Sequence, residues 1–154
     1  MEDHSWNFYK DKRTDGEVKA DFELGKYNEP LVVKNLPYRY FQVNGSDEFR
    51  EMGMYEPDYF VRINKIWFPA EVKFSCVELK YIDLKKNQAD ALAEIKGVYI
   101  QATPKKYVIV GASFMTNQKE VRGYCHKLCY RYYPDNWKFW NKKIDFRIKE
   151  KYEN

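Results

Sequence analysis

Two acidic residues and one lysine within residues 57–73 (PDYFVRINKIWFPAEVK) are the side chains best placed for chemistry. Asp58 follows a proline, and Glu71, with Lys73 two positions beyond it, comes thirteen residues later. Carboxylates held side by side raise each other's pKa unless a cation lies between them. A hard ion such as Mg²⁺ takes oxygen ligands and removes that penalty, and a nearby lysine could orient water or neutralise a phosphate. The set fits metal-assisted phosphodiester hydrolysis; the alternative is an exposed hairpin that alternates Glu and Lys.

A predicted hairpin holds these residues together. Residues 60–63 (FVRI) and 66–72 (IWFPAEV) are rich in β-branched and aromatic side chains, which favours strands, and residues 64–65 supply a turn. Asp58 would then lie at the start of one strand and Glu71 near the end of its partner, so the two carboxylates meet at one end of the sheet. The two-residue period of a strand puts Lys73 on the same face as Glu71.

Two helices are predicted around the hairpin. Residues 16–35 carry apolar side chains at helical spacing, with Asp15 as the cap at the start. Pro30 leaves open whether this helix is continuous or broken in two near residues 28–30. The second helix is predicted over residues 85–96, where good helix formers carry an apolar stripe and Gly97 ends the element.

Further strands complete the predicted order. Residues 38–43 alternate aromatic and polar side chains, and residues 74–79 are expected to continue the second strand of the hairpin. The other expected elements are strands over 98–102 and 107–110 joined by a turn at 103–105, a turn at 44–46, a loop or short helical turn over 47–55, and a short helix or strand over 124–133. The order predicts an α/β layer with helices packed against a mixed sheet.

The chain as a whole reads as one domain of 154 residues, with an arm over 1–15, a core over 16–112 and a basic, aromatic-rich C-terminal extension over 113–154. The sequence has no run of eighteen apolar residues and no apolar leader, so neither a membrane span nor export is expected. Three cysteines are few and odd in number, which favours a reducing cytoplasm.

The net charge of +4 is mild, but aromatic residues make up 18% of the chain and interleave with Lys and Arg, as in nucleic-acid-binding surfaces or in an aromatic core.

Four separated features resemble the PD-(D/E)XK nuclease superfamily, which has the restriction-endonuclease-like fold. Residues 57–58 (Pro-Asp) are similar to its PD element, and residues 71–73 (Glu-Val-Lys) to its (D/E)XK triplet. Residues 24–29 (LGKYNE) are similar to the G-x-x-x-E of its first core helix. Gln88, in LKKNQADAL, is similar to the helix-borne glutamine of Holliday-junction resolvases and related phage-type nucleases. The resemblance covers residues 16–110 and implies a mixed central sheet flanked by helices.

The resemblance implies a metal site. Asp58 and Glu71, with the carbonyl oxygen of Val72, would bind Mg²⁺, for which Mn²⁺ can substitute. Lys73 would position the attacking water or stabilise the developing charge on phosphorus. Glu29 would add a carboxylate, directly or through water.

Residues of the two helices complete the implied site. Glu23 is a rival to Glu29, but it lies six residues away and on a different helix face, so Glu29 is preferred. Gln88 would orient the lysine or the scissile phosphate. Lys85 and Lys86, in the first turn of the same predicted helix, would bind DNA phosphates.

The function that the resemblance implies is that of a metal-dependent deoxyribonuclease acting as an endonuclease, in the cytoplasm or, for a phage protein, in that of the host cell. DNA is the implied partner, and the resemblance leaves a monomer and a homodimer open. The alternatives are a non-catalytic nucleic-acid-binding protein on the same fold and a resolvase of branched DNA. Residues 115–154 match no branch of the superfamily, so the DNA structure that is cut stays open.

A separate metal site is also considered. Cys76, Cys125, His126 and Cys129 could together hold an iron–sulfur cluster or zinc. The spacing C-H-x-x-C is not that of a zinc finger, and three ordinary thiols are the favoured interpretation.

Overall fold

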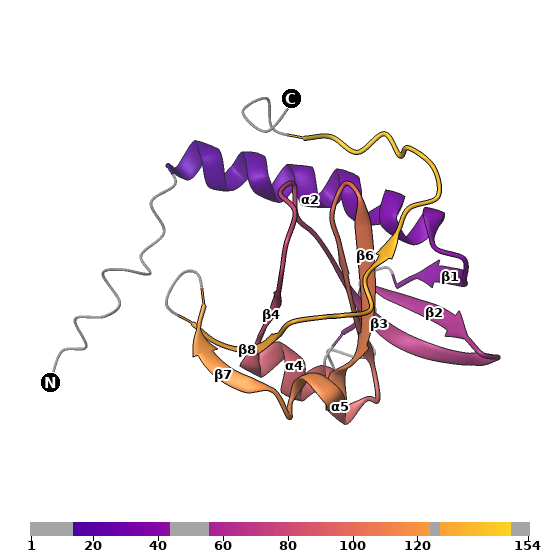
Figure 1. Ribbon diagram of the computed structural model, residues 1–154, viewed down its shortest axis with the longest axis vertical. Coiled ribbons are helices and arrows are strands. Elements are labelled where there is room, and N and C mark those ends of the chain that lie inside the picture. The colour runs from indigo at the N-terminus through magenta and orange to yellow at the C-terminus, as the bar shows by residue number, and fades with distance from the viewer. Residues whose placement is uncertain (1–13, 44–55, 124–126, 149–154) are drawn as a thin grey trace, which may run out of the picture.

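The chain forms a mixed α/β structure in which one long helix covers a six-stranded sheet, with a three-stranded antiparallel sheet beside it (Figure 1). The structure, a computed structural model, describes residues 14–43, 56–123 and 127–148. The helices are α2 (Asp15–Asn35), α4 (Lys86–Glu94) and α5 (Ala112–Met115). The strands are β1 (Arg39–Gln42), β2 (Tyr59–Ile63), β3 (Ile66–Phe74), β4 (Ile82–Lys85), β5 (Val98–Ala102), β6 (Lys106–Gly111), β7 (Lys119–Arg122), β8 (Leu128–Tyr132) and β9 (Lys138–Phe139).

The large sheet has the strand order β1-β2-β3-β5-β6-β9. Strands β3 and β5 run parallel, and the other neighbours in this sheet run antiparallel. A parallel pair needs a crossover connection, and residues 75–97 supply one that contains β4 and α4. The predicted α/β class with a mixed sheet is confirmed.

The two faces of the large sheet pack into two separate cores. On one face, Val72 of β3 and Ile100 of β5 are buried under Val32 and Val33 of α2. On the other face, Tyr99 of β5 is buried in a second core, which also contains side chains of α4, β4, β6 and β8. The register pairs Glu71 with Tyr99 and Lys73 with Gln101, so these four side chains share the face of α4, opposite α2.

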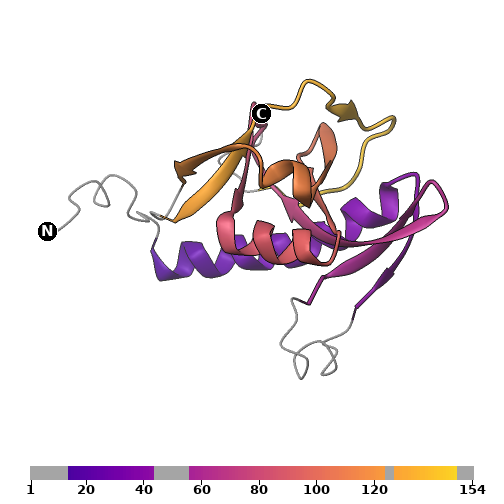
Figure 2. The same cartoon turned by 90° about the horizontal axis from the view of Figure 1, so that it is seen from below.

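The predicted hairpin is confirmed as β2 and β3. Asn64 and Lys65 both have positive φ angles, of 51° and 69°, as the two central residues of a type I′ turn require. Figure 2 shows the hairpin extending past α4 at the side of the molecule. The predicted continuation of the second strand over 74–79 is wrong beyond residue 74. There the Ser75 hydroxyl accepts a hydrogen bond from the backbone N–H of Val77 at 3.3 Å, and the chain turns away from the sheet.

Helix α2 corrects two predictions about its own sequence. Thr14, not Asp15, caps it, because the Thr14 hydroxyl accepts a hydrogen bond from the backbone N–H of Glu17 at 3.1 Å. The helix also continues through Pro30 without the break considered near residues 28–30. Proline removes one backbone hydrogen bond, but burial of Val32 and Val33 beyond it holds the last turns on the sheet. None of the described helices is long and apolar enough to cross a membrane.

The C-terminal third of the chain completes both sheets. Strands β7 and β8 pair with each other, β8 pairs with β4, and β9 pairs with β6. Residues 140–148 then run beside α2 (Figure 1), where the Asn28 side-chain amide donates to the Arg147 carbonyl oxygen and accepts from the Arg147 N–H, both at 2.8 Å. Within the region predicted as a helix or strand over 124–133, residues 128–132 are a strand. The predictions for 44–46, 47–55 and most of the N-terminal arm lie outside the described residues.

The end of α4 generates a stability prediction. The helix ends at Glu94, Lys96 takes a left-handed φ of 57°, and Gly97 directly precedes β5. A Cβ on Gly97 would lie 2.3 Å from Leu92 Cδ1 and 2.9 Å from the Pro69 carbonyl oxygen. We expect Gly97→Ala to lower the free energy of unfolding by about 1–3 kcal/mol through overpacking, measured by urea denaturation.

A matched control tests this reason. A Cβ on Gly111 would meet no atom within 4 Å, so Gly111→Ala should change the free energy of unfolding by less than about 0.5 kcal/mol. Equal losses in the two variants would contradict the steric explanation.

Candidate active site

The predicted residues Glu29, Asp58, Glu71 and Lys73 come together at one place on the large sheet. Asp58 directly precedes β2, Glu71 and Lys73 lie in the second half of β3, and Glu29 comes from α2. The charges of Asp58, Lys73 and Glu71 all act on Glu29. The sequence pattern therefore selected side chains that the fold brings within electrostatic range of one another.

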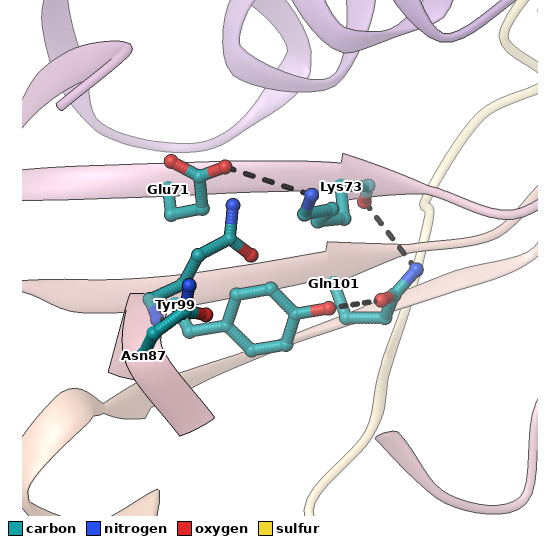
Figure 3. Close-up of polar contacts among 6 residues, drawn as sticks. Glu71, Lys73, Asn87, Tyr99 and Gln101 are labelled. Atoms are coloured by element: carbon teal, nitrogen blue, oxygen red, sulfur yellow. Dashed lines mark hydrogen bonds and ion pairs between the residues drawn. The ribbon is translucent and has the colours of Figure 1, made fainter. Parts of the chain in front are cut away.

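Glu71 and Lys73 form an ion pair along one face of β3. The distance from Lys73 Nζ to Glu71 Oε1 is 3.7 Å, and Glu71 is only 7% exposed. Figure 3 shows both side chains beside Tyr99 and Gln101 of the neighbouring strand. The Tyr99 hydroxyl donates to Gln101 Oε1, and Gln101 Nε2 donates to the Ala102 carbonyl oxygen at 3.1 Å. The buried Glu71 carboxylate thus has the Lys73 ammonium as a neighbour, and the hydrogen-bonded side chains of Tyr99 and Gln101 place fixed polar groups beside this ion pair.

The carboxyl group of Glu29 is strongly perturbed. Its pKa is raised from the ordinary 4.5 to about 7, chiefly by burial; the negative charges of Asp58 and Glu71 add to the rise, and the Lys73 charge opposes it. A carboxyl group placed among other carboxylates in a site of low polarity favours its protonated form. Glu29 therefore marks a place where a positive charge would be stabilised.

Asp58 shows the same effect. Burial raises the pKa of Asp58 above its ordinary value, while a hydrogen bond with Glu71, the Lys73 charge and the Val72 backbone N–H oppose the rise. A hydrogen bond between two carboxyl groups requires one of them to carry a proton. A cation that binds both oxygens would replace that proton.

The donor set fits Mg²⁺ with a large share of water ligands. Within the described residues, no three His, Cys, Asp or Glu side chains form a group that could hold a metal ion. Mg²⁺ usually keeps several waters and uses only one or two carboxylates. Asp58 and Glu71, with the Val72 carbonyl oxygen, would then be its protein ligands, and Glu29 would act through water.

Gln88 lies beside this group, at a cavity of about 510 Å³. Its Oε1 atom is buried and has no hydrogen-bond partner among the described residues. The cavity wall also contains Lys73, Tyr99 and Gln101, so the cavity opens directly beside the ion pair. A buried acceptor without a donor is uncommon, and here it points to a ligand or water that donates a hydrogen bond.

The two lysines predicted to bind DNA differ in their surroundings. Lys85 ends β4 and lines the cavity. Lys86 begins α4, and its Nζ lies 2.6 Å from Glu120 Oε1, which engages its charge within the protein. Lys127 lines the cavity as well, but it was not among the predicted DNA-binding residues. It lies in the C-terminal extension, far along the chain from the nuclease-like motifs, and only the fold brings it to the cavity.

Tyr99 and Gln101 were also missed, because only the register of β3 against β5 places them beside Glu71 and Lys73. A parallel partner strand has no local signature that fixes its register. Of the four residues considered for a second metal site, Cys76 and Cys129 are free thiols, whereas Cys125 and His126 lie outside the described residues.

Comparison with known proteins gives no family for this chain. The sequence matches no protein-family model and no curated protein.

The perturbed Glu29 predicts a pH dependence of stability. Because its folded-state pKa of about 7 exceeds the ordinary 4.5, the contribution of Glu29 to stability is fully present below pH 4.5 and is lost as the pH rises through 7. We expect Glu29→Gln, which stays neutral, to raise the free energy of unfolding at pH 8 in EDTA by about 1–2 kcal/mol, after allowance for partial exposure. At pH 4.5 the gain should vanish.

Urea denaturation at the two pH values measures this difference. The control is Glu23→Gln, at an exposed position of the same helix, which should show no such pH-dependent gain. A gain of equal size at both pH values would show that the charge of Glu29 is not its cause.

Proposed function

We propose that this protein is a metal-dependent deoxyribonuclease that hydrolyses phosphodiester bonds with Asp58, Glu71 and Lys73. The observation that carries the proposal is the convergence of three partly buried carboxyl groups, two with raised pKa values, around one lysine. Ordinary surface carboxylates do not show such shifts, and perturbed groups beside a cavity mark functional sites. The order helix, three antiparallel strands, crossover helix, parallel strand also agrees with the nuclease fold suggested by the sequence motifs.

Each side chain has a role that its position supports. A bound Mg²⁺ would supply positive charge to the phosphoryl oxygens and to the attacking water. Lys73, with its side chain 39% exposed, can reach a phosphate from the same face. Gln88 offers a buried acceptor that can orient a water or a substrate hydroxyl. Glu29 accepts a proton near neutral pH, which suits exchange with a water in the site.

The main alternative is a nucleic-acid-binding protein without catalytic activity. It is favoured by the lack of a three-residue metal group in the described ranges and by the Glu71–Lys73 ion pair, which neutralises part of the site. Against it, burying Glu29, Asp58 and Glu71 together with Lys73 as the one cation that the described residues place among them destabilises the fold. A protein that only binds nucleic acid would have no need of that arrangement.

The proposed function predicts that the protein binds Mg²⁺ directly. We expect calorimetric titration with Mg²⁺ near neutral pH to show binding with release of protons, because ligation requires charged carboxylates. Asp58→Asn should weaken the affinity by about 10-fold or more, whereas Glu23→Gln should leave it unchanged. Equal affinities for wild type and Asp58→Asn would place the metal elsewhere.

The proposed function also predicts metal-dependent cleavage of DNA. The protein is incubated with supercoiled plasmid, single-stranded DNA and a four-way junction, each with Mg²⁺, Mn²⁺ or EDTA. We expect cutting only with metal, and a fall in rate of about 100-fold or more for Asp58→Asn, Glu71→Gln and Lys73→Met. The substrate that is cut fastest identifies the DNA structure recognised.

The matched control for lysine is Lys138→Met, at an exposed position of β9, which should keep full activity. Retained DNA binding with no cutting of any substrate, in wild type and variants alike, would favour the non-catalytic alternative and overturn the nuclease.

A further inference from the structure

A patch of aromatic and arginine side chains lies on the same sheet face as Glu71 and Lys73. Cross-strand partners share a face, and the register pairs Arg39 with Arg62, Phe41 with Phe60, and Arg62 with Trp67. Trp67 precedes Glu71 by four residues on β3, so the two-residue period puts both on one face. We call this set, which consists of Arg39, Phe41, Phe60, Arg62 and Trp67, the aromatic–arginine face.

Two of the three rings of this face are exposed to solvent. Phe41 is 50% exposed and Trp67 is 43% exposed. Phe41 stacks on Phe60 with centroids 5.1 Å apart and planes 14° apart, and its centroid lies 5.2 Å from that of Trp67. The rings hold one another in place, so bases could stack on them with little loss of side-chain entropy.

The two arginines make the face complementary to an anion. Arg39 and Arg62 are direct partners across β1 and β2, and like charges in that position are destabilising. Within the described part of the chain neither arginine has a hydrogen bond or an ion pair. Guanidinium groups bind phosphate through paired hydrogen bonds. An incoming chain of phosphodiester groups would relieve the repulsion between the two arginines and provide a hydrogen-bond partner for each.

We infer that the aromatic–arginine face binds single-stranded DNA, with bases stacked on Phe41 and Trp67 and phosphates paired with Arg39 and Arg62. Stacking needs bases whose faces are open, which a duplex does not offer. From Trp67 to Glu71 the strand rises about 13 Å, enough for about four stacked nucleotides. The idea that the face delivers the DNA strand to the carboxylates rests on the proposed function. Binding of DNA by the face does not depend on that function, and it can be measured without metal.

The experiment measures the affinity for a fluorescent oligothymidylate by anisotropy, in EDTA so that no cutting occurs. Phe41→Ala and Trp67→Ala should each weaken binding about 5- to 100-fold. Trp67→Phe should keep most of the affinity and Trp67→Leu should lose it, because only a ring can stack. Arg39→Gln and Arg62→Gln should each reduce the slope of log affinity against log salt by about 0.7.

Controls separate the face from general surface effects. Phe139→Ala removes a ring that is 71% exposed on β9, at the opposite edge of the sheet, and should not change affinity. Circular dichroism melting confirms that each variant is folded. A blunt duplex of the same length should bind more weakly than the single strand and should be insensitive to Trp67→Phe and Trp67→Leu alike.

Other results would overturn the inference. Unchanged affinity in the Phe41, Trp67 and arginine variants would remove the face from the binding site. Sedimentation that shows a dimer broken by Trp67→Ala, with DNA affinity intact, would assign the face to a second copy of the chain. Binding that depends on the face, in a protein that never cuts DNA with Mg²⁺ or Mn²⁺, would keep this inference and reject the nuclease.

Discussion

The parallel pairing of β3 with β5 is the constraint on which the rest of the structure depends. It fixes Glu71 beside Tyr99 and Lys73 beside Gln101, and it requires the chain to return from the C-terminal end of β3 to the N-terminal end of β5. The crossover carries β4 and α4, which lie on the face of the sheet that bears Glu71 and Lys73. Strand β4 is then available to β8, so the small sheet and the cavity wall both follow from this one pairing.

Electrostatic repulsion among the carboxylates of the site opposes folding. The fold places Glu29, Asp58 and Glu71 close together and partly removes them from water, although packing alone would favour apolar side chains there. Lys73 offsets only part of the charge, since the pKa of Glu29 still rises to about 7. Such locally unfavourable free energy persists only where the surrounding structure holds the residues in place. Here the well-packed core on the other face of β3 holds them in place.

The sequence predicted the features that depend on local chemistry. The hairpin followed from β-branched and aromatic runs around Asn64 and Lys65, and the pairing of Glu71 with Lys73 on one face followed from strand period alone. The features that the sequence could not predict depend on contacts between residues far apart in the chain. The strands IDLK and KEVR are short and charged, and they become strands only because β8 lies between them. Pro30 suggested a broken helix, but the burial of residues beyond it overrides that local preference.

The C-terminal third contributes to the site without supplying a predicted catalytic residue. Asn28 directly precedes Glu29, and its two hydrogen bonds to Arg147 tie α2 to residues 140–148. The Arg147 guanidinium also lies 3.7 Å from the ring centroid of Tyr27, and Phe146 packs against Phe74 at the end of β3. One segment thus holds both the helix that carries Glu29 and the strand that carries Glu71. Because an electrostatic site depends on the distance between its charges, the C-terminal segment helps to keep the charges together that the proposed chemistry needs.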